Sequence, residues 1–139
     1  MTEVATLKTI EVKTSIEFSK ATDLIVGAFE GGSNYWINSI NWGSLRDRHK
    51  ESPWKHQKLG ETYSEVMSWC CIHGKYFWVQ VEDDDRELYE ITPAGIQRGV
   101  QTMADDLPRH FNDMVKENDD ATTSDVLLQC ILFNDIVYG

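Results

Sequence analysis

The sequence predicts an α+β fold, in which an antiparallel sheet of 3–5 strands packs against 3–4 helices in a single domain spanning residues 1–139. The strongest β pattern is EVMSWCCIHGKYFWVQVEDDDRELYEI (65–91), and helix-start signals with apolar stripes follow it. A chain of 139 residues with 41% hydrophobic content is long enough for one core and too short for two ordinary domains.

The first expected element is a strand over ATLKTIEVKTSIEF (5–18). Its apolar residues alternate with polar ones, a pattern with the period of two that is typical of a half-buried strand. We expect this strand to bend near Lys13. The alternating positions are Leu7, Ile10, Val12, Ile16 and Phe18.

A helix is expected next, over KATDLIVGAFE (20–30), with Ser19 as its N-cap. Leu24, Ile25, Ala28 and Phe29 form its apolar stripe. The pair Gly31 and Gly32 should end the helix, because glycine readily adopts the left-handed conformation of a C-cap.

The central β pattern reads as a hairpin that turns at His73 and Gly74, so that Trp69 lies opposite Trp78. One face then forms the core, with Phe77, Val79 and Val81 among its residues. The other face is aromatic and too large to be left bare in water. A third strand, 87–91, is expected after an acidic turn at 82–86.

Three helices are predicted in the C-terminal part. Thr92 followed by Pro93 starts the first, and Pro108 ends it. A short helix over 108–118 should bury Phe111, Met114 and Val115. The last helix, SDVLLQCILFNDIV (124–137), is apolar nearly all round and is therefore expected at the centre of the core. Residues Asp119, Asp120, Thr123 and Ser124 are natural caps for it.

Charge is distributed unevenly along the chain. The net charge is −10, and residues 82–139 account for all of it, with fourteen acids against four Lys and Arg. This balance argues against general nucleic-acid binding, which requires clustered Lys and Arg. One basic segment, RDRHKESPWKHQK (46–58), lies in the neutral part. Three cysteines, two of them adjacent, and the absence of a long apolar run fit a cytoplasmic protein without membrane contact.

Nine of the 15 aromatic residues lie between Tyr35 and Trp78, in the interval that also holds the basic segment. Aromatic rings can stack a base, while guanidinium and ammonium groups bind phosphates. Two interpretations stay open here. The tryptophans form sheet core or a subunit interface and the basic segment is merely solvated, or together they form a site for a small anion or nucleotide.

Other motifs favour plain structural roles. EGGSNYW (30–36) closes a helix rather than opening one and lacks the Lys of a P-loop, so we interpret it as a C-cap with a turn. The four histidines do not form a metal-ligand pattern. Because no nucleophile is accompanied by a base, we expect no enzymatic activity and no cofactor.

Two stretches carry a resemblance to a known family. PRHFNDMVKENDDATTSDVLLQCILFNDIVYG (108–139) and AFEGGSNYWI (28–37) resemble the C-terminal and N-terminal parts of a widespread group of small acidic accessory proteins of tailed phages and prophages. Members often have Gly where this chain has Ser124. The resemblance implies an accessory protein made in the cytoplasm of an infected bacterium. Counter-defence roles are frequent among such proteins, by association.

We therefore carry two functional hypotheses. In the first, the protein is a homo-oligomer that sequesters a nucleotide-type immune signal, such as a cyclic nucleotide or an ADP-ribose derivative. The expected ligand-binding residues are Asn34, Tyr35, Trp36, Trp42, Arg46, Arg48, Lys50, Trp69 and Trp78. In the alternative, the acidic residues of 82–125 imitate nucleic acid and inhibit a host defence nuclease or a CRISPR or restriction component.

Overall fold

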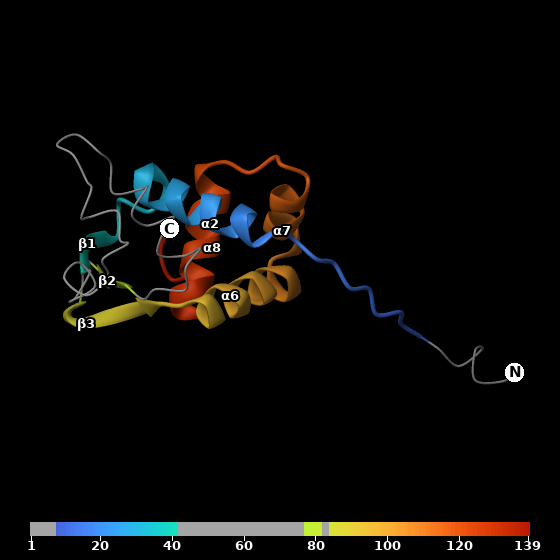
Figure 1. Ribbon diagram of the computed structural model, residues 1–139, viewed down its shortest axis with the longest axis horizontal. Coiled ribbons are helices and arrows are strands. Elements are labelled where there is room, and N and C mark those ends of the chain that lie inside the picture. The colour runs from blue at the N-terminus through green and yellow to red at the C-terminus, as the bar shows by residue number, and fades with distance from the viewer. Residues whose placement is uncertain (1–7, 42–76, 82–83) are drawn as a thin grey trace, which may run out of the picture.

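The computed structural model describes residues 8–41, 77–81 and 84–139 (Figure 1). Its helical elements are α2 (Phe18–Gly27), the π-helical turn η1 (Ala28–Gly32), α6 (Pro93–Asp106), α7 (Pro108–Val115) and α8 (Ala121–Phe133). Its strands are β1 (Ile37–Asn41), β2 (Phe77–Val81) and β3 (Asp84–Ile91). The predicted α+β fold is confirmed, with a three-stranded antiparallel sheet.

Helix α8 is the centre of the core, as its composition predicts. It lies between α2 and α6, with the sheet toward one end of the helical layer and α7 toward the other (Figure 1). Every residue from Thr123 to Ile131 is buried. Most of these buried side chains are apolar, as suits a helix packed against several elements, and the buried polar ones, Asp125 and Gln129 among them, need hydrogen-bond partners inside the protein.

The sheet has the order β1-β2-β3, and both pairs are antiparallel. Phe77, Val79 and Val81 are buried while Trp78 and Gln80 are half-buried, so the predicted core face of β2 is confirmed. The predicted turn at His73 and Gly74 and the pairing of Trp69 lie outside the described residues. β3 begins at Asp84, so 84–86 belong to a strand and not to the expected turn, because an irregularity in the ladder pairs Val81 with Asp84.

The N-terminal strand prediction is wrong. Residues 8–17 have no regular secondary structure, and they leave the body as an extended arm (Figure 1). Ile10 is 84% exposed and Val12 is 82% exposed. A period of two makes a strand only where a neighbouring strand supplies hydrogen bonds, and no described residue of the same chain pairs with the arm.

The stripe Leu24, Ile25, Ala28 and Phe29 is buried as predicted. The predicted cap is wrong, since α2 begins at Phe18 and includes Ser19. The helical run does end at Gly32, but the reason differs from the expected one, because neither glycine has a left-handed conformation. A Cβ on Gly32 would lie 2.5 Å from the carbonyl oxygen of Ala121, so close approach to α8 requires the glycine.

The C-terminal helices match the sequence in part. Thr92 caps α6 by accepting a hydrogen bond from the Gly95 amide at 3.0 Å, and α7 starts at Pro108 as predicted. Val115 is exposed, contrary to prediction, because it faces away from the core side of α7 that buries Met114. The prediction for the last helix placed it too late by about one turn, since Asp120 caps α8 and the helix ends at Phe133.

Candidate functional site

The most elaborate polar arrangement in the described residues surrounds Asp125, a residue of α8 that is only 7% exposed. Its carboxylate accepts hydrogen bonds from the hydroxyl of Ser33 at 2.7 Å, the hydroxyl of Tyr35 at 2.6 Å and the indole N–H of Trp36 at 2.7 Å. A buried carboxylate is tolerated only when donors replace the water that it has lost. Asp125 therefore holds the turn between η1 and β1 against the central helix.

Gln129, one helical turn after Asp125, holds the C-terminal end of the chain. Its carbonyl oxygen accepts from the amides of Val137 and Tyr138, both at 2.8 Å, and its amide nitrogen donates to the carbonyl of Tyr138 at 3.2 Å. The same nitrogen donates to Asp125 at 3.2 Å. We call residues 135–139 the C-terminal strap, because this fully buried amide binds them back onto α8.

The strap covers Trp36. The rings of Trp36 and Tyr138 are stacked, with centroids 5.1 Å apart and planes at 4°. Phe133 lies 5.5 Å from Trp36, and Tyr89 of β3 meets Phe133 edge-on at 4.9 Å. Trp36 is 1% exposed, so it is a core residue in this structure and offers no free ring face for a ligand base. The hypothesis that it stacks a base does not fit this geometry.

Tyr35 differs from Trp36, because its ring is accessible to solvent although its hydroxyl is held by a hydrogen bond. It is 51% exposed, while its hydroxyl donates to Asp125. Desolvation, together with the hydrogen bond and the negative charge of Asp125, raises the pKa of Tyr35 to about 12. The phenol is therefore neutral at physiological pH, and its ring is held in one orientation at the surface.

The remaining predicted ligand residues fall into two groups. Asn34 is exposed beside Tyr35, and Trp78 is half-buried on β2. Trp42, Arg46, Arg48, Lys50 and Trp69 lie outside the described residues. The strands that flank the undescribed segment are adjacent, because Asn41 at the end of β1 pairs with Trp78 near the start of β2. The described residues on either side of 42–76 are thus neighbours in the sheet.

Several acids of the alternative hypothesis have internal roles. Asp119 forms an ion pair with Lys20 at 2.6 Å. Asp120 caps α8, and the backbone N–H of Thr123 lowers the pKa of this carboxyl. Asp125 is buried. These three carboxylates stabilise the fold, and we do not count them toward an acidic docking surface.

The described residues contain few other reactive groups. Cys130 is buried on α8, and this burial raises the pKa of its thiol to about 11, which makes it a poor nucleophile at neutral pH. Within residues 8–41, 77–81 and 84–139, no three His, Cys, Asp or Glu side chains converge on a metal position. No helix of these ranges is long and apolar enough to cross a membrane.

Sequence reasoning missed the residues that organise this site, namely Ser33, Asp125, Gln129 and Tyr138. One signal was present. Asp125 and Gln129 are polar residues four apart in an otherwise apolar helix, and this spacing places them on one face. We interpreted Asp119, Asp120, Thr123 and Ser124 as caps of this helix, and Asp120 does cap it, whereas Asp119 forms an ion pair with Lys20. Asp125 was not among the predicted caps or ligand-binding residues.

No protein-family model, curated protein or solved structure matches the chain.

Proposed function

We propose that the protein is a phage-encoded counter-defence protein that sequesters a small anionic ligand of the nucleotide type. The observation that carries the proposal is Tyr35, a half-exposed ring whose hydroxyl is fixed by a buried carboxylate at 2.6 Å. A base stacks on an aromatic face, and a ring that is already ordered loses little entropy when a ligand binds.

The described residues beside Tyr35 bear on recognition of a base and not on phosphate binding. The Asp125 carboxylate is buried and accepts hydrogen bonds from Ser33, Trp36 and Gln129, so it does not face the surface. Asn34 is exposed next to Tyr35 and has an amide that can read polar edges of a base or ribose. In the proposal, Arg46, Arg48 and Lys50 bind phosphate, and Trp42, Trp69 or Trp78 adds a second stacking surface.

The resemblance to small acidic phage proteins supports the counter-defence context, and immune signals of the cyclic nucleotide or ADP-ribose type have the required chemistry. We favour this function over the nucleic-acid mimic because Asp119, Asp120 and Asp125 are used internally. The nucleic-acid-mimic hypothesis can still be tested at Asp83, Asp84 and Asp85.

A thermal-shift screen against cyclic dinucleotides, cyclic trinucleotides and ADP-ribose derivatives tests the proposal. A ligand at about 100 times its Kd should stabilise the fold by about 2.7 kcal/mol. Tyr35→Ala and Arg46→Ala should then weaken binding at least about tenfold, as measured by calorimetry. Tyr35→Phe should bind more nearly like the wild type, because it keeps the ring.

Arg109→Ala is the matched control, since Arg109 is an exposed arginine on α7, at the end of the helical layer away from the sheet (Figure 1). A found ligand whose affinity is unchanged by both Tyr35→Ala and Arg46→Ala contradicts the proposed site. A screen without any shift, combined with a pulled-down nuclease that is released by neutralising Asp83, Asp84 and Asp85, would favour the mimic.

A further inference from the structure

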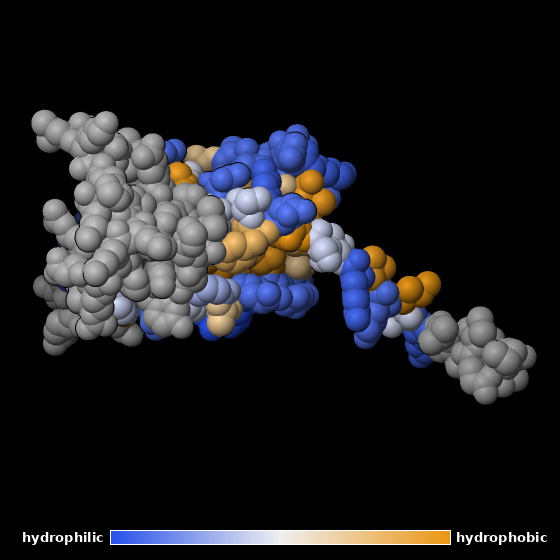
Figure 2. Space-filling model, viewed as in Figure 1, coloured by the Kyte–Doolittle hydropathy of each residue, from blue (hydrophilic) through white to orange (hydrophobic). Residues whose placement is uncertain are grey.

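The N-terminal arm, residues 8–17, exposes apolar side chains that the body of the same chain does not cover. Ile10 and Val12 are 84% and 82% exposed, and they are the two most exposed of the large hydrophobic residues described. Figure 2 shows hydrophobic residues along the arm outside the body. Single exposed apolar residues are common, but an alternating set on an extended segment has the pattern of a strand that lacks its neighbour.

The arm is complementary to a second copy of itself. If two arms pair antiparallel about a two-fold axis at Val12, Glu11 of each lies opposite the partner's Lys13, and this ion pair occurs twice. Thr9 lies opposite the partner's Ser15, on the same face of the ribbon as Glu11 and Lys13. On the opposite face, Val12 lies beside the partner's Val12. Opposite charges directly across antiparallel strands are stabilising, and like charges are not. The charges at Glu11 and Lys13 therefore favour antiparallel pairing of two identical arms.

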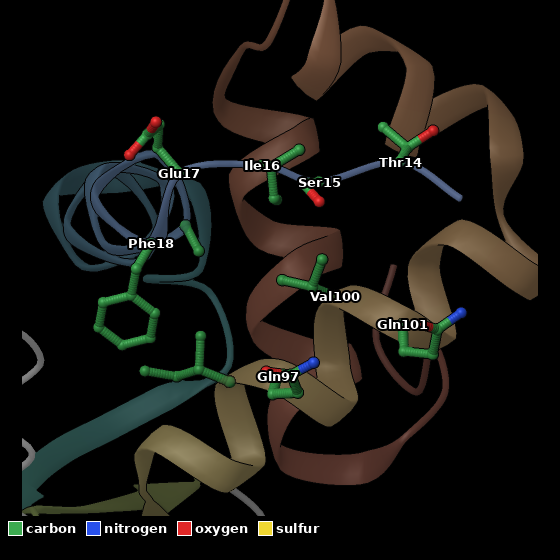
Figure 3. Close-up of a pocket in the computed structure, with 10 residues that line it drawn as sticks. Thr14, Ser15, Ile16, Glu17, Phe18, Gln97, Val100 and Gln101 are labelled. Atoms are coloured by element: carbon green, nitrogen blue, oxygen red, sulfur yellow. The ribbon is translucent and has the colours of Figure 1, made fainter.

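The arm root provides a place for the apolar face of such a pair. A cavity of about 290 Å³ lies between the root and α6, with Thr14 and Ile16 on one side and Gln97 and Val100 on the other (Figure 3). Ile16 is half-buried and packs against the core. In the antiparallel register, the partner's Ile10 lies opposite Thr14 and the partner's Lys8 lies opposite Ile16, beside this cavity. Ile16 thus connects the face of the ribbon that carries Ile10 and Val12 to the core.

We infer that the protein dimerises through its N-terminal arms, which form a two-stranded antiparallel ribbon centred on Val12. Pairing supplies backbone hydrogen bonds that no described residue of the same chain gives the arm, and it places Ile10 and Val12 against side chains of the partner. The interface is isologous, because each copy contributes the same residues. This inference does not depend on the proposed ligand, since it uses no residue of the Tyr35 site.

The charges give a specific test by analytical ultracentrifugation of the full chain. Glu11→Lys alone and Lys13→Glu alone should each weaken self-association about tenfold or more, because like charges then face each other across the axis. An equimolar mixture of the two single variants should associate again as a heterodimer, since each position then faces an opposite charge. Circular dichroism checks that both variants are folded, and neither residue touches the core.

Cross-linking tests the position of the axis. Val12→Cys should form a disulfide-linked dimer under mild oxidation, because opposed Cα atoms in an antiparallel pair lie about 4.5 to 5.5 Å apart, within disulfide range. Thr9→Cys is the matched control on the same arm, and its two copies would lie about 20 Å apart across the ribbon.

Three results would overturn the inference: a wild type that stays monomeric at high concentration, single variants that associate like the wild type or do not recover on mixing, and equal cross-linking at both positions. Recovery on mixing together with cross-linking at Val12→Cys alone supports it. Failure of the ligand screen leaves these outcomes unaffected, so the two proposals are tested separately.

Discussion

At the scale of single residues, one carboxylate, that of Asp125, joins segments that are far apart in the sequence. Asp125 gathers three donors from a turn that is about ninety positions away in the sequence, and two of these donors, on Ser33 and Trp36, are themselves buried. Loss of the acceptor would leave buried N–H and O–H groups without a partner. A buried donor without an acceptor lowers the free energy of unfolding by more than the net contribution of the hydrogen bond itself.

We expect Asp125→Ala to lower the free energy of unfolding by about 3 kcal/mol or more, for this reason. The control is Asp119→Ala, which removes a carboxylate that forms a partly exposed ion pair with Lys20. That change should cost less than about 1 kcal/mol. Urea denaturation of both variants gives the comparison, and equal losses would show that the network around Asp125 has no special weight.

Tyr35 should make the free energy of unfolding depend on pH in the alkaline range. Its folded pKa of about 12 lies above the ordinary value of 10.0, so folding favours the protonated phenol. The contribution is fully present below pH 10 and is lost as the pH rises from 10 toward 12. We expect the stability of the wild type to fall more steeply over this window than that of Tyr35→Phe, as measured by urea denaturation at each pH. Parallel curves for the two proteins would refute this assignment.

At the scale of elements, small residues set how closely the helices approach α8. Gly27 lies against Ser124, Gly32 against Ala121 and Gly99 against Ile131. At Gly99 of α6 an added Cβ would lie 2.7 Å from the Cα and 2.8 Å from the backbone nitrogen of Ile131. Backbone atoms cannot move aside as a side chain can, so α6 and α8 would have to separate.

We therefore expect Gly99→Ala to destabilise the protein by at least about 2 kcal/mol, although alanine is the better helix former. Gly95→Ala is the matched control on the same helix. Its Cβ would meet only the Thr92 hydroxyl at 3.2 Å and more distant side-chain atoms, so its effect should stay within about 1 kcal/mol. A thermal melt of each variant checks the difference, and a neutral Gly99→Ala would mean that the two helices are not in close contact.

At the scale of the whole molecule, the described residues divide into a body and an N-terminal arm. The body closes on itself, because the C-terminal strap and the turn at 33–36 are both bound to α8 and together enclose Trp36. The arm leaves this closed unit with Ile10 and Val12 exposed. The ligand screen tests the surface beside Tyr35, and the arm-pairing experiment tests association between copies.

The sequence allowed most elements to be predicted, since they depend on local signals. The Thr92 cap, Pro93 and Pro108 located the starts of α6 and α7, and an apolar stripe located α2. The alternation of Phe77, Val79 and Val81 located the core face of β2. The candidate site was predictable only around Asn34 and Tyr35, because Asp125 and Gln129 become hydrogen-bond partners of this turn through long-range packing.

The sequence by itself determined the α+β class, the central position of the last helix and the buried stripes, because periodicity and caps act over a few neighbouring residues. Only the tertiary structure decided that Trp36 is a core residue, that Asp125 is a buried acceptor and that Gly32 is needed for close approach. It also decided that the N-terminal alternation is an arm and not a strand of its own sheet. A pattern states which face of a segment is apolar, whereas contacts between distant residues decide what covers that face.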